Sequence, residues 1–482
     1  MPAAPLRVLF ATPEYAPLVK TGGLGDVSGA LPRALRETGC DARVLLPAYG
    51  ALGALGGEED SAIGLPAQAG LPAARIVPCV LPGAVPGFLL DCPVLYARAG
   101  GPYLDPEGRD WPDNALRFAQ LARAAAWLGR ADVPLAWRAD VVHANDWQTA
   151  LAAAYLAYAP APRAGSLLTV HNLAFQGIFP ATAFEALGLP PEAFSISGLE
   201  FHGQVSFLKA GLVYADAITT VSPTHAREIL QPPLGFGLEG VIAARRDALH
   251  GILNGIDTAL WNPATDPWIA RRYDADRLEA KAENRAALRA RLGLAEDPQA
   301  ALAGIVSRFT WQKGLDLVLE AAHRILALPL QLAVLGAGDR ALEEAFRRLA
   351  AAHPGRVAVR IGYDEPLAHL VEAGADLFLM PSRYEPCGMN QMYSQRYGTL
   401  PVVRATGGLA DSVSDAETGF VFREPSAEAL VAALERALQV WRDRPHWRRL
   451  QRQAMARELG WESAARRYAV LYAQIMRPIS NG

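Results

Sequence analysis

Residues 20–27 (KTGGLGDV) combine glycines with charged side chains in a way that suits phosphate binding. They follow an apolar segment, residues 7–12 (RVLFAT), and lead into a helical pattern. Consecutive glycines let the backbone approach a ligand, and the N–H groups at a helix start attract phosphate oxygens. A flexible tight turn is the alternative for the glycines alone, but the neighbouring Lys20 and Asp26 favour a binding site.

A pair of cations lies in residues 307–317 (SRFTWQKGLDL). Arg308 and Lys313 come just after a predicted strand, around a tight turn where a helix begins. Two cations in this arrangement can bind a diphosphate and neutralise its charge as it leaves a sugar. The alternative is that both side chains face solvent at the end of a helix.

A carboxylate follows a later apolar segment, in residues 382–403 (SRYEPCGMNQMYSQRYGTLPVV). Glu385 comes after the predicted strand, and we expect Pro386 to start a helix whose amides at Cys387 and Gly388 face the site. A carboxylate in this place stabilises positive charge or binds sugar hydroxyls. Taken alone, a glutamate at a helix start is more often a cap.

Other polar side chains stand where predicted strands end. They are Asp146, His171, Asn172 and Asn254. Each alone is more often a structural hydrogen-bond partner or a cap. Strand ends that converge at one edge of a parallel sheet nevertheless predict a ligand site.

Residues 336–341 (GAGDRA) fit the GxGxxA pattern of dinucleotide-binding sites. Such a site needs an acidic residue at the end of the next strand, about 20 positions on, to bind a ribose. The next strand here reads VAVRIGY, and no acid follows before Asp364. A nicotinamide-dependent dehydrogenase is therefore disfavoured.

Strand and helix patterns alternate along the chain in two series. The first series of predicted strands covers residues 7–12, 42–47, 141–145, 166–172 and 217–223, and the second covers 302–308, 331–336, 357–362, 376–382 and 400–403. Near-continuous apolar strands separated by helices indicate parallel sheets covered on both faces. The sequence thus predicts an α/β protein with two doubly wound parallel-sheet domains, joined near residues 250–260, and a site in the cleft between them. Residues 53–103 are rich in Pro and Gly and receive no assignment.

Length and composition fit a two-domain globular protein. The chain has 482 residues, of which 51% are hydrophobic and 20% charged, and a formal net charge of −3. This charge gives no general attraction to nucleic acid or to an anionic membrane, and the basic residues 442–452 are expected to form a solvated helix face. The cysteines show no zinc spacing, and we find no membrane-spanning run and no signal peptide, so we expect a cytoplasmic protein.

Several motifs follow one another in a fixed order along nearly the whole chain. They read KTGGLGDV, HNLAFQG, SFLKAGLVYAD, LNGID, SRFTWQKGLDL, GAGD and EPCGMNQMYSQRYGTLPVVRATGGLADSV. In this combination they closely resemble the motifs of bacterial glycogen synthases and plant starch synthases, glycosyltransferase family 5. The resemblance implies the GT-B architecture, two Rossmann-like domains facing a cleft. It places an N-terminal domain at 1–250, a C-terminal domain at 257–458 and a helix that returns to the first domain at 459–478.

The resemblance also implies an activity, its substrates and their binding residues. A retaining glucosyltransferase of this family transfers glucose from ADP-glucose to the non-reducing 4-OH end of glycogen or another α-1,4-glucan. The positions that match donor contacts are Lys20, Gly22, Gly23, Asn254, Tyr363 (which would stack on adenine), Cys387 and Gly388. The positions that match acceptor or sugar contacts are Asp26, Asp146 and Asn172. The positions that match catalytic residues are Glu385, His171, Arg308 and Lys313.

Retention would follow from attack by the acceptor hydroxyl on the face that the phosphate leaves. Arg308 and Lys313 would act in place of a divalent metal, and no cofactor is expected. Tyr393 stands eight residues after Glu385 in place of a second glutamate, as is usual in this family, and Gln148 replaces a frequent histidine. Two alternatives stay open: a related GT-B enzyme with another donor or acceptor, and a glucan-binding paralogue without activity.

Overall fold

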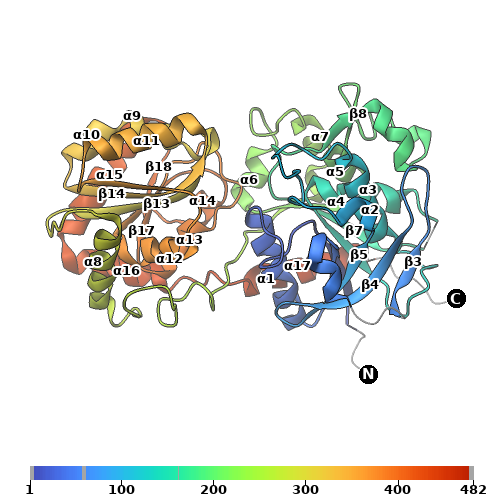
Figure 1. Cartoon of the computed structure of the whole chain (residues 1–482), viewed down its shortest axis with the longest axis horizontal. Helices are drawn as coiled ribbons and strands as arrows, with labels where there is room; N and C mark the ends of the chain where they lie inside the picture. The colour runs from blue at the N-terminus through green and yellow to red at the C-terminus, as the bar shows by residue number, and fades with distance from the viewer. Residues whose placement is uncertain (1–4, 57–60, 161, 477–482) are drawn as a thin grey trace. The chain divides into compact units, whose positions relative to one another are not determined.

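The computed structural model describes residues 5–56, 61–160 and 162–476. The chain divides into two compact units (Figure 1). Unit 1 comprises Met1–Asn254 and Trp461–Gly482, and unit 2 comprises Gly255–Gly460. Residues 477–478 of the predicted returning segment lie outside the described residues, as do parts of the predicted domain 1–250.

Unit 1 is built on a mixed sheet whose central strands are parallel. Among the described residues its strand order is β12-β11-β7-β6-β1-β2-β5-β4-β3. The strands are β1 (Arg7–Ala11), β2 (Asp41–Pro47), β3 (Ile63–Leu65), β4 (Ala74–Leu81), β5 (Val85–Asp91), β6 (Val141–Asn145), β7 (Gly165–Val170), β11 (Ala217–Thr220) and β12 (Leu249–Gly251). The strand order reverses at β1, since β2 lies on one side of it and β6 on the other.

The helices of unit 1 pack on both faces of this sheet. They are α1 (Gly23–Glu37), α2 (Pro93–Tyr96), α3 (Asn114–Trp127), α4 (Trp147–Ala157), α5 (Phe207–Tyr214), α6 (Pro223–Glu228), α7 (Glu239–Ala244) and α17 (Glu462–Ile475), with short 3₁₀ turns at η1 (Gly50–Leu55), η3 (Ala181–Leu187), η4 (Pro191–Ala193) and η5 (Arg246–Ala248). One core lies under α3, α4 and α5 and the other under α1 and α17. β6 and β7 are buried along their whole length, including the polar side chains of His143, Asn145 and Thr169, as expected for central strands that are covered on both faces.

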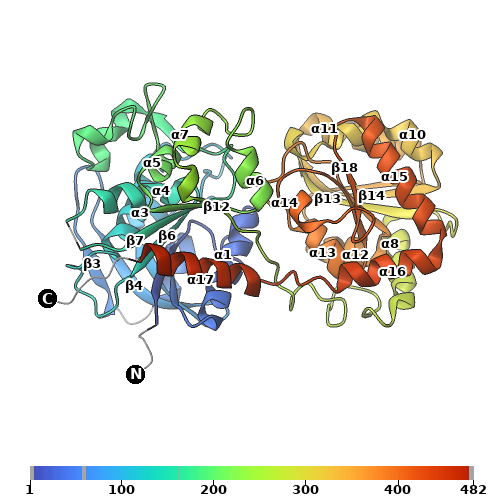
Figure 2. The ribbon, with the colours of Figure 1, turned by 180° about the vertical axis from the view of Figure 1, so that it is seen from behind.

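The C-terminal helix belongs to unit 1, although it follows the whole of unit 2 in sequence. Figure 2 shows α17 lying beside α1. Its residues Ala465, Tyr468 and Tyr472 are buried in the core that α1 also lines, and the Tyr472 hydroxyl lies 2.7 Å from Nδ1 of the buried His143. The predicted helix at the C-terminus is therefore present.

Unit 2 carries a parallel sheet in the order β15-β14-β13-β16-β17-β18. Its strands are β13 (Ala301–Phe309), β14 (Leu330–Gly338), β15 (Val357–Ile361), β16 (Leu377–Met380), β17 (Leu400–Arg404) and β18 (Phe420–Phe422). Numbered along the unit, this is the 3-2-1-4-5-6 order of the Rossmann fold, with its reversal between β13 and β16.

Helices cover both faces of this second sheet as well (Figure 1). They are α8 (Lys281–Leu292), α9 (Leu315–Glu320), α10 (Ala322–Ala327), α11 (Arg340–Ala352), α12 (Glu365–Gly374), α13 (Asn390–Arg396), α14 (Gly407–Ser412), α15 (Ala427–Arg442) and α16 (Arg444–Met455), with 3₁₀ turns at η6 (Leu278–Ala280) and η7 (Trp311–Lys313). One core packs α9, α10, α11 and α15 against the sheet, and the other packs α8, α12 and α14. The predicted α/β class with two doubly wound domains is confirmed.

Three features differ from the prediction. Within the unassigned residues 53–103, β4 and β5 form an antiparallel hairpin, and β3 pairs antiparallel with β4 at the end of the sheet. Further along the chain, β8 (Ile178–Pro180), β9 (Glu200–Phe201) and β10 (Gln204–Ser206) form a separate small antiparallel sheet. The helix expected to start at Pro386 begins at Asn390 instead. Gly388 has a φ of +70°, a left-handed conformation that a right-handed helix excludes.

None of the helices in the described part of the chain combines the length and the hydropathy that crossing a membrane requires. The four cysteines are all buried and carry free thiols.

Candidate functional site

The candidate site residues of unit 1 follow three neighbouring strands, β1, β6 and β7. Glu14 comes after β1, Asp146 after β6, and His171 and Asn172 after β7. The reversal of strand order lies between β1 and β6, and ligands of open α/β sheets bind at the carboxyl edge beside such a reversal. The structure thus brings Asp146, His171 and Asn172 together, as the strand ends predicted.

Glu14 organises the glycine loop. Its Oε2 accepts hydrogen bonds from the backbone N–H of Thr21 at 2.7 Å and of Gly22 at 3.2 Å, while its Oε1 accepts from Thr21 Oγ1 at 2.6 Å and from Tyr103 Oη at 2.5 Å. Glu14 is only 3% exposed, and both oxygens of its carboxylate accept hydrogen bonds within the protein, so its role is to hold the loop in place. Glu14 was not predicted as a site residue, because a single acid between Pro13 and Pro17 matches no catalytic spacing.

The loop itself opens the 15-residue helix α1 at Gly23, with Gly22 as its N-cap. The positive end of the helix dipole therefore lies within the loop, where it favours an anion. Lys20 is an exposed residue whose ammonium lies 2.7 Å from Asp26 Oδ1. The two charged residues that we assigned to donor and acceptor are thus paired with each other.

Asp146 holds the backbone of the His171 loop. Its Oδ1 accepts hydrogen bonds from the N–H of His171 at 2.6 Å and of Asn172 at 3.3 Å. Asp146 itself has a φ of +55°, which is rare for a residue other than glycine and costs about 1–3 kcal/mol. Backbone strain of this kind persists only where the surrounding structure fixes it, and it is found most often at functional sites.

The hydrogen bonds of His171 determine which of its nitrogens can act. Nε2 lies 2.9 Å from Asn145 Oδ1, and Asn145 Nδ2 donates to Ala11 O, so the Asn145 oxygen accepts and Nε2 donates. Burial lowers the pKa of His171 to about 3, and the ring is neutral near neutral pH. Nδ1 is then a hydrogen-bond acceptor, suited to a sugar hydroxyl.

Burial acts in the opposite sense on Asp146. It raises the pKa of this carboxyl to about 7, against the lowering effect of the two amide hydrogen bonds. His171 is therefore neutral near pH 7, and the Asp146 carboxyl is easier to protonate than an ordinary aspartate. Such a pair suits the orientation of a neutral, hydroxyl-rich ligand.

The candidate site residues of unit 2 lie at the reversal of strand order between β13 and β16. A cavity of about 170 Å³ opens there, and Arg308, Lys313, Ser382, Gly388 and Asn390 are among the residues that line it. Arg308 is an exposed residue and the second-last residue of the strand β13, rather than lying beyond it, and Lys313 ends the 3₁₀ turn η7. Both predicted cations thus line one cavity.

Lys313 also forms an ion pair that the sequence did not predict. Its Nζ donates to Glu385 Oε2 at 2.6 Å, and Ser382 Oγ donates to the same oxygen at 3.1 Å. The side chains of Lys313 and Glu385 are 18% and 6% exposed. A buried carboxylate needs such a partner, so Lys313 holds Glu385 in place beside the cavity.

The backbone after Glu385 is held by glycines of a later segment. Gly408 N donates to Glu385 O and to Pro386 O, both at 3.1 Å. A Cβ on Gly407 would lie 1.9 Å from Glu385 O, and one on Gly408 would lie 2.1 Å from Cys387 O. The two glycines of the TGGLADSV motif thus allow the Glu385 loop to pack closely against α14.

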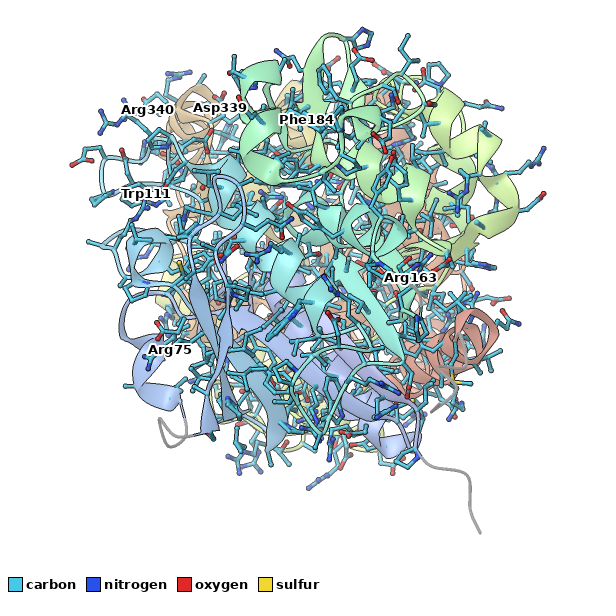
Figure 3. The ribbon with its side chains drawn as sticks, turned by 90° about the vertical axis from the view of Figure 1, so that its right-hand side faces the viewer. Arg75, Trp111, Arg163, Phe184, Asp339 and Arg340 are labelled. Atoms are coloured by element: carbon cyan, nitrogen blue, oxygen red, sulfur yellow. The ribbon has the colours of Figure 1, made fainter. Side chains whose placement is uncertain are left out.

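The glycines of the GAGD segment have a structural role in the described structure. A Cβ on Gly336 would lie 1.8 Å from Ser307 O, and one on Gly338 would lie 2.3 Å from Phe309 O. They let β14 approach the end of β13, which carries Arg308. Asp339 caps α11 by accepting from Ala341 N and Leu342 N, and Figure 3 shows Asp339 and Arg340 at the surface.

Three predicted residues stand apart from these groups. Tyr363 is 76% exposed and donates from its hydroxyl to Glu365 Oε2 at 3.0 Å. Asn254, the last residue of unit 1, is 6% exposed, and its buried Oδ1 has no hydrogen-bond partner among the described residues. Cys387 is 6% exposed, so its side chain is part of the packing of the loop.

The chemistry that these groups allow is transfer of a phosphate-activated sugar. Arg308 and Lys313 can neutralise a diphosphate, Glu385 can stabilise positive charge on a sugar, and neutral His171 can orient a hydroxyl. No group of three or more His, Cys, Asp or Glu side chains within the described ranges has the geometry of a metal site.

Comparisons with known proteins agree with this chemistry. Residues 7–244 match the family model described as the starch synthase catalytic domain, and residues 285–454 match the model for glycosyl transferases group 1. A glycogen synthase of Aromatoleum aromaticum is 56% identical over 98% of this chain and 97% of its own length. One from Dechloromonas aromatica is 54% identical over 97% and 98%.

A solved structure extends the likeness to three dimensions. The catalytic domain of starch synthase IV from Arabidopsis thaliana, solved with ADP and acarbose bound, has a TM-score of 0.85 and 31% sequence identity, and the match covers 98% of this chain and 99% of that one. A sucrose-phosphate synthase of Thermosynechococcus elongatus shares the fold, with a TM-score of 0.59 and 19% identity.

Proposed function

The chain belongs to the starch synthase family of GT-B glycosyltransferases, and from this premise we propose that it transfers glucose from ADP-glucose to the 4-OH at the non-reducing end of an α-1,4-glucan such as glycogen. The observation that carries the proposal is the buried Glu385, fixed by Lys313 beside the cavity that Arg308 also lines. This places a carboxylate and two cations at the reversal of strand order in unit 2.

In the proposed reaction the bond between the anomeric carbon and the ADP oxygen breaks. The leaving diphosphate takes the electron pair, and Arg308 and Lys313 neutralise its negative charge. Arg308 can bind two phosphate oxygens with its planar guanidinium, whereas Lys313 acts as a point charge. The sugar that remains has oxocarbenium character, which the Glu385 carboxylate stabilises.

The acceptor side of the reaction is assigned to unit 1. His171 Nδ1 accepts a hydrogen bond from a sugar hydroxyl, and the Asp146 carboxyl holds the loop that carries it. Retention follows if the acceptor 4-OH attacks from the face that ADP leaves, and the departing phosphate takes its proton. Glu385 then stabilises charge and forms no covalent bond with the sugar.

We propose that this reaction needs no divalent metal. A leaving nucleoside diphosphate is neutralised either by a metal ion or by fixed cations, and the unit 2 cavity supplies the second kind. Excess EDTA should leave the initial rate unchanged, while Arg308→Ala should lower it by about 10²–10³-fold. Loss of activity in EDTA with recovery in added magnesium would refute this part of the proposal.

The proposed preference for adenine over uracil rests on Tyr363. Its exposed ring follows β15 at the carboxyl edge of the sheet, and stacking on a base contributes about 1–3 kcal/mol. A related enzyme with another donor is the competing function. We expect kcat/KM for ADP-glucose to exceed that for UDP-glucose at least tenfold and Tyr363→Ala, unlike Tyr363→Phe, to raise KM for ADP-glucose. Equal efficiency with both donors would favour the competing function.

A cytoplasmic location remains part of the proposal, and fractionation of expressing cells tests it.

A further inference from the structure

A cavity in unit 1 lies at the carboxyl edge of the sheet, beside the glycine loop. Its volume is about 290 Å³, close to the lower end of the range of roughly 300–1,000 Å³ for small-molecule pockets. Its walls come from residues 18–20 after β1, residues 49–50 after β2 and residues 96–102 after β5 and α2. Lys20 lines this cavity, so the cavity adjoins the loop that we assigned to the donor.

The cavity is lined by three cations, and the described residues that line it include no Asp or Glu. The cations are Lys20, Arg98 and Arg117. Lys20 forms an ion pair with Asp26, and Arg98 forms one with Asp113. Arg117 forms no ion pair among the described residues. The cavity therefore carries an uncompensated positive charge, which attracts an anion.

Arg117 gives the strongest indication of an anionic ligand. It is 2% exposed, and two of its three guanidinium nitrogens have structural partners. Nε donates to Leu95 O at 3.0 Å, and Nη1 donates to Pro102 O at 2.8 Å and to Asn114 Oδ1 at 2.7 Å. Nη2 makes no hydrogen bond among the described residues. A buried cation without a carboxylate partner is costly, and an anion that binds Nη2 would offset that cost.

Aromatic rings surround these cations. Tyr49, Tyr96 and Trp111 line the cavity, and the guanidinium carbon of Arg117 lies 5.9, 5.9 and 5.7 Å from their ring centroids. The Tyr49 hydroxyl is buried and has no hydrogen-bond partner among the described residues. Burial raises the pKa of Tyr49, so this hydroxyl keeps its proton and can donate to an anion. The rings offer apolar surface to the C–H groups of a sugar.

We propose that this cavity binds the phosphate ester of a monosaccharide, with the phosphate at Arg98 and Arg117 and the sugar ring against Trp111. Fixed cations recognise the phosphate, and the aromatic wall distinguishes a sugar phosphate from a bare inorganic anion. A cavity at the small end of the range suits a ligand of this size better than a nucleotide sugar.

Lys20 connects this cavity to the catalytic loop. A phosphate in the cavity offers the Lys20 ammonium a partner that competes with the phosphate of the donor. The ligand should therefore inhibit the enzyme by weakening the binding of ADP-glucose. This inhibition rests on the proposed function, whereas binding of the ligand does not.

Isothermal titration calorimetry in a buffer free of phosphate and sulfate measures binding directly, with glucose 1-phosphate as the probe. We expect the unaltered chain to bind it and Arg98→Gln to bind it about tenfold more weakly, because a charged hydrogen-bond donor is lost. Arg109→Gln changes an exposed cation that pairs with Asp105 in the next part of the same segment, and this matched control should bind normally. No binding to the unaltered chain, or equal affinity in Arg98→Gln, would overturn the proposal. If Arg98→Gln does not fold, Trp111→Leu gives the same test at the half-buried Trp111.

Two comparisons distinguish this cavity from the diphosphate site of unit 2 and a sugar phosphate from a free anion. Arg308→Ala, which removes a cation from the unit 2 cavity, should bind glucose 1-phosphate normally. Loss of binding in Arg308→Ala with normal binding in Arg98→Gln would overturn the proposal, because the anion would then lie at the diphosphate site. Inorganic phosphate should bind the unaltered chain more weakly than glucose 1-phosphate does. Equal affinities for the two probes would overturn the assignment to a sugar phosphate.

Kinetics test the connection through Lys20. Saturating glucose 1-phosphate should raise the KM for ADP-glucose severalfold and leave kcat unchanged, and the effect should be weaker in Arg98→Gln but normal in Arg109→Gln. Inhibition of equal strength in Arg98→Gln would overturn the proposed connection. If the unaltered chain transfers no glucose to any acceptor, the proposed function fails, whereas calorimetry still decides whether the cavity binds the sugar phosphate.

Discussion

Lys313 has two tasks in this account, and a double-mutant cycle with Glu385 separates them. Its Nζ lies 2.6 Å from Glu385 Oε2, in a pair whose side chains are 18% and 6% exposed. It also lines the cavity assigned to the diphosphate. The cycle compares Lys313→Met, Glu385→Gln and the double variant with the unaltered chain.

The structure sets the expected stabilities. Lys313→Met leaves the buried Glu385 carboxylate with a hydrogen bond from Ser382 Oγ, and breaking a buried ion pair costs about 3–5 kcal/mol. The partial exposure of Lys313 puts the expected cost at about 3 kcal/mol. Glu385→Gln removes the charge and keeps an acceptor, so Lys313→Met should then cost under about 1 kcal/mol. The coupling free energy of the pair is expected to be about 2 kcal/mol.

Rates give the second half of the test. Each single variant should lower kcat by about 10²–10³-fold. The double variant should be little worse than the poorer single one, because Glu385→Gln replaces the carboxylate that Lys313→Met leaves without its positioning partner. Urea unfolding at pH 7 measures stability, and initial rates of ADP release measure activity. Arg324→Ala, which removes an exposed pair with Glu428 in unit 2, should change neither. Additive effects in both measurements would refute the assigned role of Lys313.

Three further predictions concern the loops that position the site. Glu14→Gln keeps one acceptor oxygen and should destabilise unit 1 by about 2–3 kcal/mol in urea unfolding and expose the glycine loop to trypsin; an unchanged cleavage rate would refute the role of Glu14. Burial lowers the pKa of His171 in the folded chain to about 3, below the unfolded value of about 6.5, so stability is lost as the pH falls from about 6.5 towards 3. Relative to His171→Gln, the unaltered chain should therefore lose about 2 kcal/mol of unfolding free energy between pH 7 and pH 5. Parallel curves of stability against pH for the two proteins would contradict this. Gly388→Ala places a Cβ 2.6 Å from Gln391 Oε1 at a φ of +70° and should cost about 1–2 kcal/mol and more than tenfold in kcat, whereas normal activity would show that the Glu385 loop tolerates the shift.

Much of the fold follows from local sequence patterns. β6 and β7 carry no charged side chain and contain short apolar runs, which suits strands whose two faces are covered by helices, and this pattern predicted them. The polar residues after them, Asp146 and His171, could be placed at strand ends for the same reason. The strands β4 and β5 were not assigned, since Pro78 in β4 and Pro86 and Gly87 in β5 interrupt the apolar pattern by which a strand is recognised.

Parts of the site depend on contacts that no local pattern reveals. The pair between Lys313 and Glu385 joins residues 72 positions apart and exists only because β13 and β16 are neighbours in the sheet. The hydrogen bond from Tyr103 to Glu14 likewise joins residues 89 positions apart that only the folded chain brings together. The helix start at Pro386 was wrong because proline suits the first turn of a helix, whereas the left-handed Gly388 two residues later prevents one.

Extension of an α-1,4-glucan with retention at the anomeric carbon can be followed by proton NMR of a mixture of the purified protein, ADP-glucose and maltotriose. We expect equal amounts of ADP and maltotetraose, with the anomeric proton of the added glucose showing an α-1,4 linkage from the first turnover. A β-linked product, or ADP released together with free glucose and no lengthened acceptor, would contradict it.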